Sequence, residues 1–174
     1  MSRIDPSKFD ISIINETARR AGEAILEVYA RDFEVETKAD SSPLTEADRA
    51  ANTVIMADLE KHFPGVPVIS EENKEVPYEE RKDWDWFWLV DPLDGTKEFI
   101  KKNGEFTVNI ALMKGENPWA GVVYQPVTET LYFGRVDLGA WKKNGEEETA
   151  LGGGKHYTEC DEVTVVASRS ASER

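Results

Sequence analysis

The sequence WFWLVDPLDGT at residues 86–96 joins an apolar run to two acidic residues, a proline and a glycine. The apolar run 86–90 predicts a buried strand. A residue that precedes proline is pushed to extended geometry, so we expect Asp91 to end this strand. The proline and the glycine then predict a tight bend around Asp94. The two carboxylates should therefore face one small volume where the strand ends.

Oxygen atoms gather in this predicted turn. Asp91 and Asp94 supply carboxylates, and we expect the Leu93 carbonyl to be released from the sheet ladder, which makes a donor set suited to a hard divalent cation. Thr96 adds a hydroxyl, and backbone N–H groups from Gly95 onward can receive a phosphate if a helical turn begins there. Carboxylates this close repel each other unless a cation or a proton neutralises one. An ordinary surface turn is the alternative, so the wider sequence has to decide.

Length and charge limit the class of protein. The chain has 174 residues, enough for one good core, and its 40% hydrophobic and 32% charged residues are typical of a globular protein. A formal net charge of −13 argues against a nucleic-acid polymer or an anionic membrane surface as partner. No stretch approaches the roughly 18 apolar residues of a membrane span, and the N-terminus lacks a signal-peptide core, so we expect a cytoplasmic protein. One cysteine and two isolated histidines give no zinc motif.

Two amphipathic helices are expected ahead of the central strand. Residues 9–29 place apolar side chains at three- and four-residue spacings, with charged residues between them. A second helix is predicted from Thr45, which can act as N-cap, to about residue 63, where Pro-Gly stops it. Asp48 falls in its first turn, where a carboxylate suits the helix dipole. The alternative is that Asp48 faces the acidic turn, and spacing alone does not choose.

A further apolar strand is predicted at residues 66–70, and it ends in Glu71 and Glu72. If this strand lies beside the central one, Glu71 and Asp91 emerge at one edge of the sheet, and Glu71 becomes a metal ligand. The alternative is a solvated acidic loop that leads into the charged segment 74–83.

The rest of the chain is expected to form strands joined by loops. The other predicted strands are residues 35–37, 106–113, 119–124, 130–135, 140–142 and 163–167. The short turns between the later strands favour antiparallel hairpins. Residues 38–43 are predicted to be a polar loop and 152–154 a glycine linker. The last strand resembles the start of another α/β unit, so we expect a domain over residues 1–160 and, in 161–174, the first strand leading to a second domain that is absent.

Three motifs together resemble the inositol monophosphatase superfamily of lithium-sensitive, magnesium-dependent phosphatases. They are SSPLTEAD at residues 41–48, ISEE at 69–72 and WLVDPLDGT at 88–96, in the family's order and spacing. The segments that resemble its 3′(2′),5′-bisphosphate nucleotidase branch are KAD at 38–40, KEFI at 97–100, NGEFTVNIAL at 103–112 and SRS at 168–170. The resemblance implies a layered α+β fold in which two N-terminal helices pack on a large, mostly antiparallel sheet.

The resemblance also assigns binding roles. The positions that match the family's metal ligands are Glu71, Asp91, Leu93 through its carbonyl, and Asp94, with Mg²⁺ as the expected cofactor. The positions that match its substrate-binding residues are Glu71, Leu93, Asp94, Gly95 and Thr96, the last two as phosphate-binding positions. The implied partner is a small phosphorylated nucleotide.

Catalytic roles follow from the same resemblance. Asp48 and Thr96 match the pair that orients and deprotonates the attacking water, and Glu72 matches an acid behind the metal ligands. The expected reaction is hydrolysis of 3′-phosphoadenosine 5′-phosphate to AMP and phosphate, with the sulfated analogue as a second candidate substrate. Inositol mono- or polyphosphates and fructose 1,6-bisphosphate are the alternatives; Lys97 after the turn favours the nucleotide.

The family's second domain has no counterpart in this sequence. It carries a Trp-Asp-x-x-Ala-Gly type motif and a further metal-binding aspartate, so one metal position is expected to be weak and the activity reduced. A non-enzymatic alternative is a chain that binds a cation loosely and pairs with another chain, or with itself, through the sheet face left by the missing half.

Overall fold

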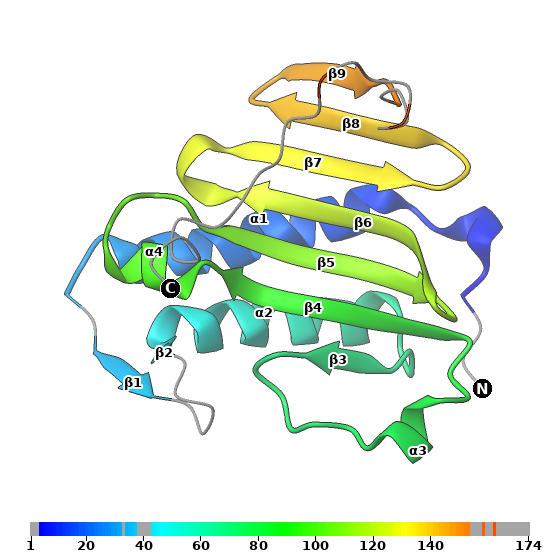
Figure 1. The fold of residues 1–174 in the computed structure, drawn as a ribbon, viewed down its shortest axis with the longest axis horizontal. Coiled ribbons are helices and arrows are strands. Elements are labelled where there is room, and N and C mark those ends of the chain that lie inside the picture. Colours follow the sequence, from blue (N-terminus) through cyan, green and yellow to red (C-terminus); the bar gives the residue numbers. More distant parts are fainter. Residues whose placement is uncertain (1–3, 33, 38–42, 154–157, 159–161, 163–174) are drawn as a thin grey trace.

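Two long helices form one layer of the molecule, and a seven-stranded sheet forms the other (Figure 1). The structure is a computed structural model, and it describes residues 4–32, 34–37, 43–153, 158 and 162. The predicted layered α+β architecture is confirmed, with both N-terminal helices on one face of a mostly antiparallel sheet. No helix among these residues is long and apolar enough to cross a membrane.

Both long helices begin at a side-chain cap. They are α1 (Ile11–Tyr29) and α2 (Glu46–His62). Asp10 and Thr45 each accept a backbone N–H of the first turn, at 2.9 and 3.2 Å, so the chain leaves the extended conformation where these residues stand. The two helices are tied to each other by Arg20 of α1, which donates to the buried carboxylate of Asp58 on α2 at 2.6 Å.

The strands of the sheet lie side by side in chain order. They are β3 (Val68–Ser70), β4 (Trp86–Asp94), β5 (Thr107–Lys114), β6 (Asn117–Gln125), β7 (Thr130–Arg135), β8 (Gly139–Asn144) and β9 (Glu147–Leu151). Strands β3 and β4 are parallel, and each later strand pairs antiparallel with the one before it. The predicted hairpins are therefore confirmed. Strand β9 was not predicted, because all five of its residues are exposed and show no apolar alternation.

Several short elements complete the described chain. They are η1 (Pro6–Lys8), β1 (Val35–Thr37), β2 (Pro43–Thr45), α3 (Tyr78–Arg81), α4 (Thr96–Ile100) and η2 (Pro126–Thr128). Strand β2 pairs with β1, so the predicted loop at 38–43 is wrong at Pro43. The segment 74–83, predicted to be a loop, contains the one-turn helix α3. The predicted strand at 163–167 lies outside the described residues, and the proposed division at residue 160 stays a prediction.

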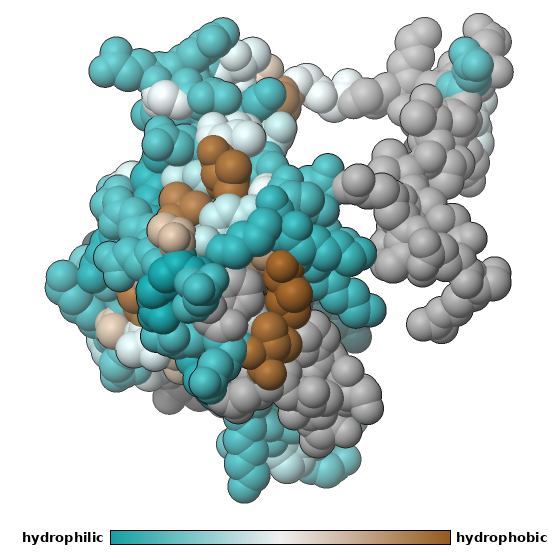
Figure 2. Space-filling view, turned by 90° about the vertical axis from the view of Figure 1, so that its left-hand side faces the viewer, coloured by the Kyte–Doolittle hydropathy of each residue, from teal (hydrophilic) through white to brown (hydrophobic). Residues whose placement is uncertain are grey.

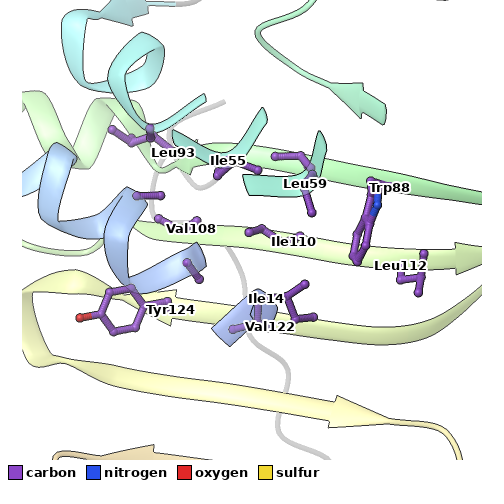
Figure 3. Close-up of a cluster of buried hydrophobic side chains, with 14 of the residues drawn as sticks. Ile14, Ile55, Leu59, Trp88, Leu93, Val108, Ile110, Leu112, Val122 and Tyr124 are labelled. Carbon is purple, nitrogen blue, oxygen red and sulfur yellow. The ribbon is translucent and has the colours of Figure 1, made fainter. Parts of the chain in front are cut away.

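The core lies between the helices and the sheet (Figure 3). Alternate side chains of β4, β5 and β6 face the helices, as the two-residue period of a strand requires. Trp88, Ile110 and Val122 from three neighbouring strands meet Ile14 of α1 and Ile55 of α2, and all five are at most 3% exposed.

The opposite face of the sheet is apolar and has no covering layer among the described residues. Its largest exposed apolar side chains, each 40–46% exposed, are Leu89, Val123, Tyr132 and Leu151. Ala111, Gly121, Gly134 and Ala140 follow one another in register across four neighbouring strands. This row of small residues forms the floor of a hollow of about 710 Å³. We call this surface the open face.

Gly22 allows helix α1 to approach strand β6 closely. A Cβ added there would lie 2.5 Å from Cε1 of Tyr124 and 3.1 Å from Cγ of Pro126. Alanine normally stabilises a helix interior by about 1 kcal/mol relative to glycine, but overpacking a rigid contact costs about 1–3 kcal/mol. We therefore expect Gly22→Ala to lower the free energy of unfolding, measured by urea denaturation. Glu16→Ala, at an exposed site on α1, should change it by less than about 0.5 kcal/mol; a Gly22→Ala variant more stable than wild type would contradict this packing.

Candidate active site at the ends of strands β3 and β4

Strands β3 and β4 form the one parallel pair in the described sheet, and an acidic residue follows or extends each of them at the same edge. Ser70 lies opposite Val90, so Glu71 and Asp91 are the next residues along the two neighbouring segments. The Glu71 N–H donates to the Val90 carbonyl at 3.2 Å, which continues the pairing by one residue. The predicted proximity of Glu71 and Asp91 at one edge is therefore confirmed.

The prediction that Asp91 ends its strand is wrong. Strand β4 continues to Asp94, with a register shift against β5 between these two aspartates. A residue before proline prefers extended geometry, which a strand also has, so the strand passes through the proline by a bulge. Leu93 has no partner in the β5 register, and its carbonyl accepts the Thr96 hydroxyl at 3.3 Å. The bulge thus turns this carbonyl toward the site.

Gly95 makes the change from strand to helix. Its φ of +94° lies in the left-handed region, and an added Cβ would lie 2.8 Å from the Glu105 carbonyl oxygen. Helix α4 starts at the next residue, Thr96, so the helical turn that the sequence left as a condition is present. Phe99 of α4 is fully buried, so the short helix is fixed to the core and Thr96 has a defined place.

Asp48 performs both of the roles between which the sequence left a choice. Its Oδ2 accepts the Thr45 backbone N–H at 2.7 Å and the Thr45 hydroxyl at 2.6 Å, which forms a capping box at the start of α2. Its Oδ1 accepts the Thr96 hydroxyl at 3.3 Å. Asp48 is only 2% exposed, so both carboxylate oxygens are committed to these contacts rather than to solvent.

Asp91 carries the clearest electrostatic signature of the site. Burial, followed by the negative charges of Glu71 and Asp94, raises the pKa of Asp91 from 3.8 to about 7. Its Oδ1 is buried and has no hydrogen-bond partner among the residues that the structure describes. A buried carboxylate oxygen that faces like charges is stabilised by a proton or a cation.

The acidic side chains do not form a ready-made cage. Within the described ranges, no three His, Cys, Asp or Glu side chains are arranged to hold a metal ion as they stand. The hard oxygen donors and the orphaned oxygen of Asp91 fit a cation such as Mg²⁺.

Polar residues beside the acids were missed from the sequence. Asn109 donates to Oδ2 of Asp94 at 3.4 Å and accepts the Thr107 hydroxyl at 3.1 Å. An asparagine inside an otherwise apolar strand was the available signal.

Glu72 lies in the turn after β3, and its N–H donates to the Ser70 hydroxyl at 3.3 Å.

Figure 2 looks onto the end of the molecule where β4 meets α4, the left-hand end in Figure 1. The described residues that it shows are mostly hydrophilic, with small apolar patches between them. This surface suits a polar ligand better than an apolar one.

The two-layer α+β domain, with acidic side chains where its parallel strands end, agrees with the phosphatase family that the sequence motifs resemble. The chain belongs to the inositol monophosphatase family, whose sequence pattern it matches over residues 8–174.

Relatives and solved structures agree with this membership. The 3′(2′),5′-bisphosphate nucleotidase CysQ of Escherichia coli O157:H7 is 53% identical over 130 residues, which cover 74% of this chain and 52% of the relative. The crystal structure of CysQ from Bacteroides thetaiotaomicron has a TM-score of 0.67 at 47% identity, covering 78% of this chain and 49% of that one. SuhB from Bartonella henselae, an extragenic suppressor protein, has a TM-score of 0.69 at 30% identity, covering 76% and 51%. The chain spans about half the length of these relatives.

The raised pKa of Asp91 predicts how pH changes the stability of the cation-free protein. In the folded state the carboxyl of Asp91 has a pKa of about 7, whereas its ordinary pKa is 3.8. The folded state therefore binds more protons between these values, and stability falls as pH rises from about 4 to about 7. We expect Asp91→Asn to be more stable than wild type, with a difference that is small near pH 4 and complete above pH 7, as measured by thermal unfolding with chelator.

Asp137→Asn is the matched control for this measurement. The Arg135 side chain donates a hydrogen bond to Asp137 that lowers its pKa, so this exposed aspartate has the opposite sign. Its replacement should give no gain in stability as pH rises. A difference between Asp91→Asn and wild type that stays constant from pH 4 to pH 8 would show that Asp91 does not titrate as inferred.

Proposed function

We propose that this chain carries the acidic site of a Mg²⁺-dependent, lithium-sensitive phosphatase that hydrolyses the 3′-phosphate of 3′-phosphoadenosine 5′-phosphate. The observation that carries the proposal is the hydrogen bond between Asp48 of α2 and Thr96 of α4, which closely follows Asp91, the aspartate with the raised pKa. The identity to bisphosphate nucleotidases supports this substrate over other phosphate esters. The proposed setting is the cytoplasm, and the sulfated nucleotide is a second candidate substrate.

The proposed cation ligands are Glu71, Asp91, Asp94 and the Leu93 carbonyl. A bound Mg²⁺ supplies positive charge that neutralises the phosphate and makes a coordinated water more acidic. Without that charge, an acidic site on a chain of net charge −13 repels a phosphorylated substrate. We therefore assign to the chain's own carboxylates the role of binding the cation next to the phosphate of the substrate.

Thr96 and Asp48 are proposed to activate the attacking water. The oxygen of the water forms a bond to phosphorus while the bond from phosphorus to the 3′ oxygen breaks. The proton of the water passes to the Thr96 hydroxyl, whose own proton passes to Asp48. The departing 3′ oxygen takes up a proton from solvent to complete AMP, and Asp48 releases its proton to solvent. The contact of 3.3 Å between Thr96 and Asp48 supports this relay.

The remaining site residues are proposed to bind and orient. Backbone N–H groups at Gly95 and Thr96 bind phosphate oxygens at the start of α4. Glu72 acts behind Glu71 as an acid that orients the ligands. The proposed reaction has no covalent intermediate between enzyme and substrate, because the water attacks the phosphate directly.

Phosphate release tests the proposal. The panel is 3′-phosphoadenosine 5′-phosphate, inositol 1-phosphate and fructose 1,6-bisphosphate, each with Mg²⁺, with and without lithium. Release from the nucleotide that lithium suppresses is the expected result. Preference for one of the other substrates would reassign the substrate, and silence on all three from folded protein would contradict catalysis by this chain.

Asp94→Asn is expected to abolish most of the phosphatase activity. The change keeps the shape of the side chain and removes a charged ligand, so we expect phosphate release to fall by at least about 100-fold, since even residues outside the ligand shell commonly cost 10–100-fold. The fold should persist, because Asp94 is exposed and its loss relieves repulsion on Asp91. Asp137→Asn, an exposed aspartate on the turn after β7, should keep full activity. Activity retained by Asp94→Asn would remove Asp94 from the proposed ligand set.

A second candidate function is self-association through the open face, which we propose for the non-catalytic alternative. One row of this face carries Asp91 on β4 and Lys142 on β8, connected in register through Asn109, Val123 and Tyr132. A second copy related by a two-fold axis along the strands places the acidic end of one row over the lysine end of the other. Charge complementarity thus favours a second copy of this chain as the occupant, and burial of the apolar side chains would drive the contact.

Light scattering over a wide range of protein concentration tests this pairing. We expect dimers, and we expect Leu89→Glu to shift them to monomers because it places a charge among the apolar side chains that line the hollow of the open face. Val127→Glu is the matched control, since Val127 lies on η2 outside the hollow and is 45% exposed, against 46% for Leu89. A wild-type chain that stays monomeric at every concentration would exclude the pairing.

A further inference from the structure

The turn that carries Glu71 and Glu72 is held by an asparagine from helix α2. The Ser70 hydroxyl donates to Oδ1 of Asn52 at 2.8 Å, and Nδ2 of Asn52 donates to Oδ1 of Asn73 at 2.9 Å. The amide of Asn52 thus bridges the residue before Glu71 and the residue after Glu72. Both acidic residues lie between these two attachment points.

Other hydrogen bonds also fix the turn: the Glu71 N–H donates to the Val90 carbonyl at 3.2 Å, and Nδ2 of Asn73 donates to Sδ of Met56 on α2 at 3.4 Å. Asn73 donates its N–H to the Ser70 carbonyl at 3.1 Å, and Glu72 donates its N–H to the Ser70 hydroxyl at 3.3 Å. Ser70 is only 6% exposed, so its hydroxyl depends on partners in the protein rather than on solvent. Removing the Asn52 amide would take away the oxygen that accepts the buried Ser70 hydroxyl and the N–H that donates to Oδ1 of Asn73.

Asn52 also connects this turn to the other half of the site. It follows Asp48 by four residues on α2, so the two side chains lie on the same side of the helix, one turn apart. Asp48 contacts Thr96 at the start of α4, and Asn52 contacts the turn after β3. One side of α2 therefore sets the distance between the Thr96 hydroxyl and the Glu71 turn.

We propose that Asn52 is a positioning residue that holds Glu71 in place for a divalent cation. This inference rests on the cation site of the proposed function. Asn52 touches neither the cation ligands' carboxylates nor the substrate in this assignment; it acts through Ser70 and Asn73. Loss of its amide should weaken cation binding while the helix and the sheet stay folded.

Mg²⁺ binding to the full chain, measured by isothermal titration calorimetry, tests the inference. We expect Asn52→Ala and Ser70→Ala each to weaken Mg²⁺ binding by about 10–100-fold. The double variant should be little weaker than either single one, because both changes break the same bridge. Thr53→Ala is the matched control: Thr53 is the next residue on α2, and its exposed hydroxyl donates to the carbonyl of Arg49 in its own helix at 2.8 Å. It should bind Mg²⁺ like wild type.

Amide hydrogen exchange of the cation-free protein supplies a second readout. In Asn52→Ala, the amides of Glu72 and Asn73 should exchange faster, whereas those in the middle of β5 should not change. A general loss of stability would instead speed exchange across the sheet, so the pattern separates positioning from a merely structural role.

The outcomes separate this inference from the proposed function. If wild type binds Mg²⁺ and Asn52→Ala binds it equally well, the positioning role is wrong and the cation site stands. If wild type binds no Mg²⁺, the cation site is wrong and positioning for a cation falls with it; faster exchange at Glu72 and Asn73 alone would then show only that Asn52 holds the turn. If wild type binds Mg²⁺, unchanged exchange rates at these two amides in Asn52→Ala also overturn the inference.

Discussion

Negative charges held side by side at one edge of a sheet are the constraint on which the candidate site depends. Glu71 and Asp91 lie together because β3 and β4 run parallel, with Ser70 opposite Val90, so the residues that follow these two come out at the same edge of the sheet. Burial and repulsion together raise the pKa of Asp91 to about 7. A fold that keeps such an arrangement forgoes stability near neutral pH in the absence of a ligand. Clusters of acidic side chains with raised pKa values are common at functional sites, where a bound positive charge offsets the repulsion between the carboxylates.

Helix α2 is the element that organises the surroundings of these charges. Its first turn is closed by Asp48, whose second oxygen holds the Thr96 hydroxyl, and its second turn presents Asn52 to the Glu71 turn. The same side chain therefore starts a helix and faces the site. Because the start of α2 and the geometry of the site share Asp48, a change in one is transmitted to the other. The part-buried contact between Arg20 and Asp58 fixes this helix to α1, further from the site.

The periodic parts of the fold could be predicted from the sequence, and the irregular parts could not. Both long helices and most hairpins follow from apolar spacing and caps, since each signal is local. Strand β9 gave no such signal, because it is an exposed edge strand whose only requirement is pairing with β8. The bulge after Asp91 was missed because extended geometry before proline suits both a strand that ends and one that continues. At the site, the acids and Thr96 could be named from motifs, whereas Asn52 reads as an ordinary polar residue on a helix until Ser70 is seen beside it.

The order of the strands has a consequence for how the molecule assembles. From β4 to β9, each strand pairs with the next one along the chain, so the sheet forms largely from local contacts with short loops to close. The contacts that define the site span more of the chain: Asp48 and Thr96 are 48 residues apart, and Asn52 and Ser70 are 18 apart. These contacts require α2 to have docked on the sheet. The relative placement of Thr96 and the Glu71 turn is therefore a product of the completed tertiary structure, because the strands alone lack the contacts that α2 makes with both.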